Sequence, residues 1–262
     1  MRLIDVHTHL GQFSNSRQSA DGDTLCRMLR QAGISQAIAF SAEACYGGTD
    51  LGNAYTFQEV CKHEMLQMLL VVHPLHYQSS VKHLNEYADH PKVIGVKIHP
   101  HLGGYHVLDC KLTQLIEREI APRRLPILSH VGNDAPNVQA TDFFHLASRF
   151  PEIHFIAAHL ANGILGNGQG GTNAWHGMQP KNVWLDMATL RAFHTGCLQN
   201  YITEIGEDRI CFGTDAPLYW PAAFTHTLET IDLEPDVRER IAWKNALVAF
   251  PRLAADIRHI RP

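Results

Sequence analysis

Two histidines separated by a single residue, His7 and His9, stand near the start of the chain in the stretch MRLIDVHTHLG. Side chains at positions i and i+2 of a β-strand point to the same side. The two imidazole rings would therefore share one face, while Val6 and Thr8 would face the covering helices. Two imidazoles on one face can hold a single metal ion, and a bound ion can lower the pKa of water to about 7. By itself the pair is a weak motif, because histidines are also common on exposed strands.

Further residues able to bind metal or carry protons stand at the ends of other apolar runs. Lys97 and His99 share a face in GVKIHP, His130 ends the run ILSH, and His159 ends the run IAAH. Asp215 follows the last run, in FGTDAP. Mixed imidazole and carboxylate ligands suit zinc, and also iron, manganese, nickel or cobalt. The HxH pair alone would not predict a metal site, but the repetition of such residues at the ends of several expected strands does.

The elements that would position these residues are eight short apolar runs, each followed by a segment with helical periodicity. Strands that alternate with helices indicate parallel β/α units, and eight such units predict an α/β fold of the (β/α)8 TIM-barrel type. An open doubly wound sheet is the alternative, but it usually carries a glycine-rich turn after its first strand, where this chain has HTHLG. We expect one barrel domain over residues 1–262. The expected strands are 3–9, 36–41, 67–74, 92–100, 125–132, 153–161, 182–189 and 209–217.

Composition argues against several classes of protein. The chain has 262 residues, is 45% hydrophobic and 18% charged, and carries a formal net charge of -4. It therefore lacks the basic bias typical of nucleic-acid binding. Its longest apolar stretches have the length of strands and are too short to span a membrane. We expect no secretory signal, six reduced cysteines and a cytoplasmic protein.

One segment is too long and too glycine-rich for a simple connection. Residues 161–177, ANGILGNGQGGTNAWHG, follow the sixth expected strand and contain six glycines. We expect a mobile loop over one mouth of the barrel. The stretch GNGQGG lacks the Lys-Ser/Thr pair of a phosphate-binding loop, so nucleotide binding is not expected.

In their order, these strand-end residues resemble the amidohydrolase superfamily. The opening LIDVHTHLG and the closing WKNALVAFPRL resemble its family-2, decarboxylase-related branch. The resemblance covers the whole chain and implies that His7, His9 and Asp215 bind a first divalent ion, expected to be zinc. It also implies that Asp215 is the general base, taking a proton from metal-bound water and passing it to the leaving group. A small-molecule substrate and, as for many family members, a homodimer are implied as well.

Lys97 separates two versions of this site. The stretch VIGVKIHPHLGG resembles urease-type members, in which the lysine is carbamylated and bridges two ions. A free ammonium beside a dication would be repelled, so Lys97 would have to lose its proton or react with carbon dioxide. If it is carbamylated, His130 and His159 hold a second ion. If it is not, His130 joins the first ion and His159 orients water or substrate.

Four other residues have both a functional and a structural interpretation. Asp5 is expected to accept a hydrogen bond from a ligand histidine or to support the barrel floor. His99 would contact the substrate carbonyl, or cap the turn before Pro100. Asp186 would touch substrate or serve as a structural carboxylate. Arg191 would hold a substrate carboxylate as a bidentate fork, or lie in solvent.

The leading functional hypothesis is a metal-dependent hydrolase that attacks an amide, a cyclic amide or a lactone. The alternative keeps the site and changes the chemistry to nonoxidative decarboxylation, or hydration, of a small carboxylic acid. A TatD-type nuclease also begins with HxH, but it typically carries a glutamate where this chain has GVKIHP. A non-catalytic barrel is disfavoured because none of the expected ligands is missing.

Overall fold

Nine strands form one sheet, in the order β2-β1-β3-β4-β5-β6-β7-β8-β9. The computed structural model describes residues 1–14, 16–132, 135–163 and 170–253. Neighbouring strands from β1 to β9 are parallel, and only β2 pairs antiparallel, at the end of β1. The strands are β1 (Ile4–Gln12), β2 (Ser19–Ala20), β3 (Gln36–Ser41), β4 (Leu66–Val71), β5 (Val93–Ile98), β6 (Ile127–Ser129), β7 (Phe155–Ala157), β8 (Val183–Asp186) and β9 (Ile210–Cys211).

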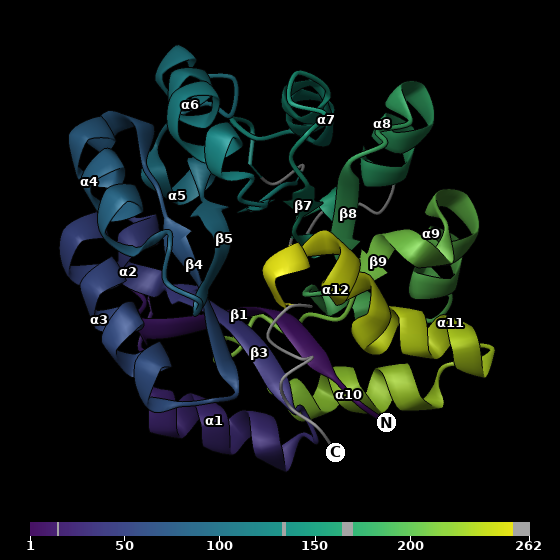
Figure 1. Ribbon diagram of the computed structural model, residues 1–262. Coiled ribbons are helices and arrows are strands. Elements are labelled where there is room, and N and C mark those ends of the chain that lie inside the picture. Colours follow the sequence, from purple (N-terminus) through teal and green to yellow (C-terminus); the bar gives the residue numbers. More distant parts are fainter. Residues whose placement is uncertain (15, 133–134, 164–169, 254–262) are drawn as a thin grey trace.

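Helices surround the strands as an outer ring (Figure 1). In the part of the chain that the structure describes, no helix is long and apolar enough to cross a membrane. The α-helices are α1 (Gly22–Gln31), α2 (Ala42–Cys45), α3 (Thr49–Lys62), α4 (Tyr77–Tyr87), α5 (Pro100–Gly103), α6 (Cys110–Leu115), α7 (Ala140–Ser148), α8 (Gly170–Met178), α9 (Cys197–Ile205), α10 (Pro221–Thr230), α11 (Pro235–Glu239) and α12 (Asn245–Ala249). Shorter helical turns are η1 (Pro74–His76), η2 (Ile116–Ile120), η3 (Ala121–Arg123), η4 (His159–Ala161), η5 (Leu190–Phe193), η6 (Glu207–Arg209) and η7 (Arg240–Lys244).

The sheet closes on itself where the chain beyond β9 returns to β1. The backbone N–H of Val6 donates to the carbonyl of Phe212 at 3.0 Å, and that of His9 donates to the carbonyl of Ala216 at 2.7 Å. Asp215 N–H in turn donates to the carbonyl of His7 at 2.8 Å. These bonds join the first and last parallel strands, which confirms the predicted (β/α)8 barrel.

Local signals fix the helices that separate the strands. α1 begins after Asp21, whose carboxylate accepts a hydrogen bond from the backbone N–H of Thr24 at 2.8 Å. Such N-caps satisfy a backbone donor that the first turn cannot pair. Leu25 and Leu29 lie one turn apart on the buried face, and Gly33 takes the left-handed φ of +75° that follows the helix end. The apolar spacing predicted this helix.

The eight predicted strands are all present, but several are shorter than expected. β6 and β7 have three residues each, because the predicted runs include loop residues that continue past the hydrogen-bonded ladder. The short antiparallel β2 was not predicted. The predicted loop 161–177 is a loop only in part: its end forms α8, while residues 164–169 lie outside the described residues.

Two apolar layers cover the two faces of the barrel wall. One set of apolar side chains fills the interior of the barrel. It includes Ile38 of β3, Leu69 of β4, Leu128 of β6 and Ile156 of β7. The alternate residues pack outward against the helices. Val6 belongs to the interior set, although strict alternation with His7 predicts that it faces the helices. The register of β1 against β3 shifts between Asp5 and Thr8, and this irregularity turns consecutive side chains inward.

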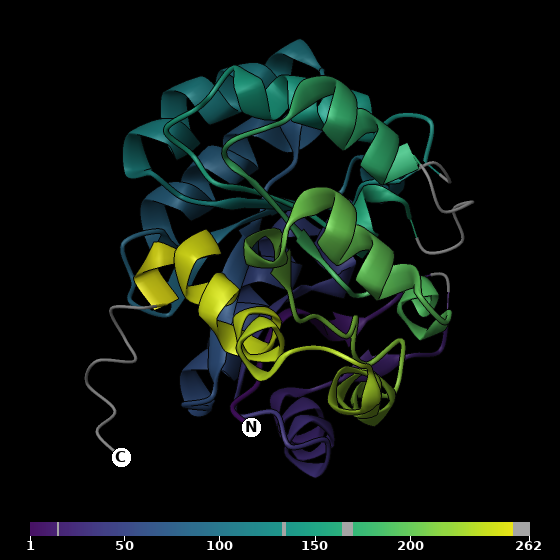
Figure 2. The same ribbon diagram turned by 90° about the vertical axis from the view of Figure 1, so that its right-hand side faces the viewer.

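The C-terminal helix closes one end of the barrel. Ala246, Ala249 and Phe250 pack into the interior cluster with Ile4 and Trp184. α12 accordingly lies across the ring of strands, and a view turned by 90° shows it at the edge of the molecule away from α8 and α9 (Figures 1 and 2). The opposite end, at the carboxyl ends of the strands, is left for polar side chains.

Candidate functional site

A cavity of about 420 Å³ lies at the carboxyl ends of the strands. Five parallel strands each deliver a histidine or carboxylate to it: β1 from within the strand, and β5, β6, β7 and β9 from positions just beyond the strand end. Parallel strands of a barrel all end at the same face, so residues far apart in sequence meet there. Its wall includes six of the predicted site residues, namely His7, His9, His99, His130, His159 and Asp215.

Asp215 stands at the centre of this group. Its Oδ1 lies 2.8 Å from Nε2 of His9 and 3.3 Å from Nε2 of His7. All three side chains are almost completely buried. The HxH alternation therefore works as predicted, since both rings turn the same nitrogen toward one carboxylate oxygen.

Asp215 and His159 adopt left-handed backbone conformations, with φ of +61° and +59°. Such angles are unfavourable for residues other than glycine, by about 1 kcal/mol or more. Hydrogen bonds hold both residues in place: Asp215 N–H donates to His7, and His159 N–H donates to Oδ1 of Asp186 at 2.9 Å. The backbone is thus shaped to aim these two side chains, which no sequence pattern indicates.

Asp186 positions two histidines without lining the cavity. Its Oδ2 accepts a hydrogen bond from Nδ1 of His7 at 2.8 Å, and its Oδ1 accepts from the backbone of His159 and of Ala188. A carboxylate behind a ligand histidine fixes the ring and its tautomer. Because Nδ1 of His7 carries the proton, Nε2 presents a lone pair toward Asp215.

The same reasoning assigns protons in the pair His159 and His130. Nδ1 of His159 contacts the carbonyl of Ala188, which can only accept, so this nitrogen is the donor. Nε2 of His159 is then the acceptor and receives a hydrogen bond from Nδ1 of His130 at 3.0 Å. The one lone pair of His159 Nε2 is thus engaged by His130, and a metal ion bound at this nitrogen would replace that hydrogen bond.

Burial keeps the site histidines neutral. It lowers the pKa of His7 and of His9 well below the usual value, and the neighbouring Lys97 charge lowers both further. Burial also lowers the pKa of His159 to about 4, with the nearby His130 acting in the same direction. Neutral imidazole is the form that binds metal ions.

Burial has the opposite effect on the central carboxyl. It raises the pKa of Asp215 to about 7, although the positive charges that His159 and Lys97 can carry oppose the shift. A carboxyl that titrates near neutral pH can both accept and donate a proton.

The donor set suits a divalent cation. One ligand atom from each of His7, His159 and Asp215 lies within 4.8 Å of the others, and all three residues are buried. Nδ1 of His9 has no hydrogen-bond partner among the described residues, although it is buried. Neutral imidazoles around one carboxylate match the ligands preferred by zinc and by related transition metals.

Lys97 lies behind the histidines rather than among them. Its side chain is 1% exposed, and Nζ lies 4.5 Å from the centre of the Phe40 ring. Burial lowers its pKa to about 8, while Cys45 and two carboxylates oppose that effect. An amine with this pKa is still mostly protonated at neutral pH, and its charge lies over the face of the Phe40 ring.

His99 combines both roles that the sequence leaves open. Its Nδ1 accepts a hydrogen bond from the backbone of Leu102 at 3.3 Å, so it caps the turn that begins at Pro100. Its ring also stacks on His130, with centroids 4.6 Å apart and an angle of 11°. The ring faces the cavity, where it can touch a ligand.

Asp5 does not bond a ligand imidazole. It accepts from the hydroxyl of Thr214 at 2.6 Å, from the backbone of Thr214 at 3.1 Å and from the backbone of His7 at 3.0 Å. It therefore fastens β1 to the segment after β9, which carries Asp215. The expected support of a ligand ring falls to Asp186 instead, because the β1 register shift turns Asp5 toward the barrel closure.

Arg191, like Lys97, is absent from the wall of this cavity. It lies on η5 and lines a second cavity, together with residues of α8 and α9. Conversely, Phe13 and Tyr46 line the histidine cavity and had no signal in the sequence. Isolated aromatic residues in connections have no periodicity that would reveal what they face.

Comparison with known proteins agrees with this fold. A family model described as amidohydrolase matches residues 4–252. No curated protein sequence matches the chain.

Solved structures of similar fold include two decarboxylases and an amidohydrolase, and two of these three structures hold a metal ion. A 2,6-dihydroxybenzoate decarboxylase from Rhizobium has a TM-score of 0.74 at 14% identity, over 95% of this chain and 98% of that one. A dihydroxybenzoic acid decarboxylase from Polaromonas sp. JS666, with bound manganese, has a TM-score of 0.75 at 15% identity, over 95% and 96%. An amidohydrolase from Burkholderia multivorans, with bound zinc, has a TM-score of 0.70 at 13% identity, over 96% and 99%.

Proposed function

The chain belongs to the amidohydrolase family, and from this premise we propose that it is a metal-dependent decarboxylase acting on a small carboxylic acid. The observation that carries the proposal is the buried contact of His7 and His9 with Asp215, which places one carboxylate oxygen against two imidazoles at the mouth of the barrel. The similarity in fold to two decarboxylases supports this alternative over hydrolysis, which the sequence ranks first.

The residues that would hold the ion are His7, His159 and Asp215, whose ligand atoms lie close together. His9 would join them, since its Nε2 lies 2.8 Å from Oδ1 of Asp215. A bound divalent metal would polarise a substrate oxygen as a Lewis acid. We propose zinc or manganese, since each is bound in one structure of similar fold. One ion per chain is proposed, with Lys97 uncarbamylated, because its Nζ packs on Phe40 behind the ligand atoms.

Asp215 would supply the proton that decarboxylation requires. A π-electron pair of an aromatic or unsaturated substrate takes the proton from the protonated carboxyl and forms the new C–H bond at the carbon that carries the carboxylate. The bond to the carboxylate carbon then breaks, its electron pair restores the π system, and carbon dioxide leaves. Solvent restores the proton on Asp215. His99 and His130, which stack in the cavity wall, would orient the substrate.

The test is a substrate screen with an isotopic readout. Metal-loaded protein is incubated in D2O with hydroxybenzoic acids and other small carboxylic acids, and carbon dioxide release is measured. The expected product carries one deuterium at the carbon that lost the carboxylate. Asp215→Asn should reduce turnover by about 100-fold or more. Asp89→Asn, at an exposed position, is the matched control and should retain full activity.

Hydrolysis is the competing outcome. Lactones, amides and cyclic amides are therefore included in the same screen. Turnover of one of these compounds, with no carboxylic acid decarboxylated, would contradict the proposal and restore the hydrolase hypothesis. Elemental analysis of the same preparation should find one zinc or manganese per chain, and two ions would favour a carbamylated Lys97.

A further inference from the structure

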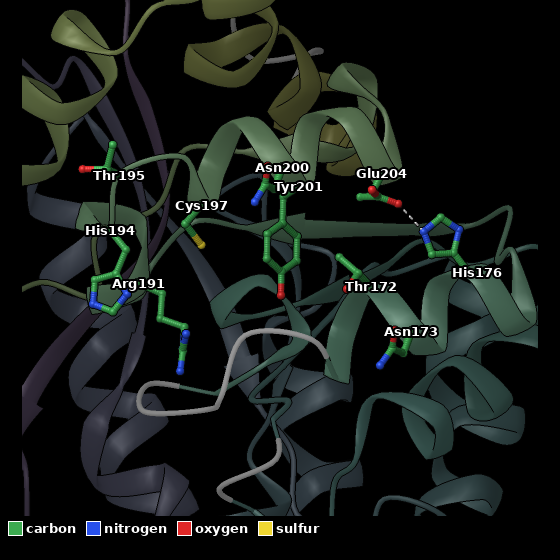
Figure 3. A pocket seen from close by; sticks show the side chains of 10 residues that line it. All are labelled: Thr172, Asn173, His176, Arg191, His194, Thr195, Cys197, Asn200, Tyr201 and Glu204. Carbon is green, nitrogen blue, oxygen red and sulfur yellow. Dashed lines mark hydrogen bonds and ion pairs between the residues drawn. The ribbon is translucent and has the colours of Figure 1, made fainter.

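A second cavity, of about 550 Å³, lies between α8, η5 and α9. Its walls are polar, with Thr172 and Asn173 on one side and Asn200 on another (Figure 3). The described residues that line this cavity and those that line the histidine cavity have no member in common. A cavity of this size is large enough for a small organic molecule.

Arg191 brings a positive charge to this cavity without a counter-charge. In the described part of the chain its guanidinium makes no ion pair, and its Nε is buried without a hydrogen-bond partner. The one carboxylate in the wall, Glu204, is already paired with Nε2 of His176 at 2.5 Å (Figure 3). Arg191 lies in η5, and its backbone N–H donates to the hydroxyl of the capping residue Thr189, so its backbone is fixed.

Tyr201 presents a second unsatisfied donor to the same space. Its side chain comes from α9, the residue is 2% exposed, and its hydroxyl has no hydrogen-bond partner among the described residues. Burial raises the pKa of this phenol, so the hydroxyl keeps its proton and can donate. Figure 3 shows the hydroxyl end of Tyr201 and the guanidinium of Arg191 pointing into the same part of the cavity.

A buried donor without a partner is costly, and two that converge from different elements indicate a ligand that accepts from both. We propose that this cavity binds a small polar organic acid, whose carboxylate lies between the guanidinium of Arg191 and the hydroxyl of Tyr201. The planar guanidinium matches a carboxylate, and the amides of Asn173 and Asn200 suit a polar body. This site is independent of the function proposed above.

The charges in the wall favour a carboxylate over a phosphate. A phosphate monoester carries close to two negative charges at neutral pH. The cavity offers one unpaired cation, Arg191, and Glu204 would repel a second negative charge. A singly charged carboxylate is balanced by Arg191 alone.

The experiment measures binding by titration calorimetry, with gluconate and lactate as carboxylate probes at constant ionic strength. Glucose serves as an uncharged counterpart of gluconate, and inorganic phosphate as the other anion. The wild type and the Asp215→Asn variant are both titrated. This substitution alters the histidine cavity, so binding heat that is the same in both proteins does not come from that cavity. We expect one site for gluconate or lactate in both proteins, no binding of glucose and weaker binding of phosphate.

Variants then locate the site. Arg191→Gln should weaken carboxylate binding by about tenfold or more, and Tyr201→Phe by about tenfold. Arg118→Gln, at an exposed position, is the matched control and should bind like the wild type. If Arg191→Gln does not fold, Arg191→Lys replaces it, since lysine keeps the charge and loses the fork.

Cys197 provides a local readout, because it lines this cavity while Cys61 and Cys110 are exposed elsewhere. The bound probe should slow alkylation of Cys197 by N-ethylmaleimide and leave the other two cysteines unchanged. Equal affinities for wild type and Arg191→Gln, or no binding of either carboxylate to the wild type, would overturn the proposal. Tighter binding of phosphate than of both carboxylates would overturn the assigned ligand class.

Discussion

Asp186 shows how a residue acts on the site through another side chain. It does not itself line the cavity, yet it fixes the ring of His7 through Nδ1 and the backbone of His159. The sequence leaves its role open because a carboxylate at the end of a buried strand fits either interpretation. Its contact with His7 spans 179 positions of the chain, so only the closed barrel reveals it.

At this residue, Asp186→Asn should weaken metal binding by about 10- to 100-fold. The amide accepts a hydrogen bond from His7 less strongly than the carboxylate does and adds no charge behind the ring. Metal affinity is measured by competition with a fluorescent chelator. Asp89→Asn controls for the loss of one surface charge. An affinity equal to that of the wild type would show that Asp186 does not position His7.

At the scale of elements, the closure between β1 and the end of β9 determines whether the ligands meet. Asp5 and Thr214 hold this seam, and both side chains are fully buried. His7, on β1, and Asp215, in the segment after β9, stand directly next to it. The same hydrogen bonds that close the barrel therefore set the distance between the metal ligands.

Thr214→Val should destabilise the protein by about 1–3 kcal/mol, because it removes a donor to the buried carboxylate of Asp5. The free energy of unfolding is measured by urea denaturation of the metal-free protein. Thr203→Val, at an exposed position on α9, is the matched control. A similar decrease in the free energy of unfolding in the two variants would mean that the Thr214 hydroxyl stabilises the protein no more than an exposed hydroxyl on a helix does.

The turn after β4 contains a buried histidine, His73, from which we predict a pH dependence of stability that does not involve the metal ligands. His73 is 3% exposed, and its Nδ1 accepts a hydrogen bond from Leu75. Burial lowers its pKa from 6.5 to about 4, and the nearby His76 adds to the effect. Between these two values the unfolded chain binds the proton and the folded chain does not. The contribution of His73 to stability is therefore largest above pH 6.5 and falls as the pH drops toward 4.

His73→Asn should flatten this fall by up to about 1 kcal/mol per pH unit. Asparagine can still accept from Leu75, so the turn retains its cap. Unfolding free energies at several pH values between 4 and 7 give the slope. The same substitution at exposed His145 should leave the slope as in the wild type. Parallel curves for wild type and His73→Asn would refute the assignment.

At the scale of the whole molecule, the metal should link the carboxyl ends of several strands. A ligand that binds only the folded chain stabilises it by about 2.7 kcal/mol when present at 100 times its Kd. For a protein of this size, chelation should then lower the Tm by roughly 5–10 °C. Thermal unfolding with and without chelator tests this. The Asp215→Asn variant should not respond, and a wild type that also does not respond would argue against a bound metal.

Much of the fold can be predicted from local sequence pattern. The features that cannot be predicted depend on strand register and tertiary packing. The eight parallel strands are confirmed because apolar runs and helical spacing are properties of neighbouring residues. The predicted loop 161–177 is partly wrong, since glycines at its end are tolerated in α8 where packing supports the helix. The inward turn of Val6 is missed because it depends on the register against β3.

The site divides in the same way. By itself the sequence determined which residues stand at strand ends, and a barrel brings His7, His9, His130, His159 and Asp215 into one cavity. Tertiary structure decided what each of them contacts: Asp186 behind His7, Asp5 in the seam, and Arg191 in a separate cavity. Periodicity fixes the face and the end of a strand on which a side chain lies. Contacts across more than a hundred residues depend on register and closure, which local pattern does not encode.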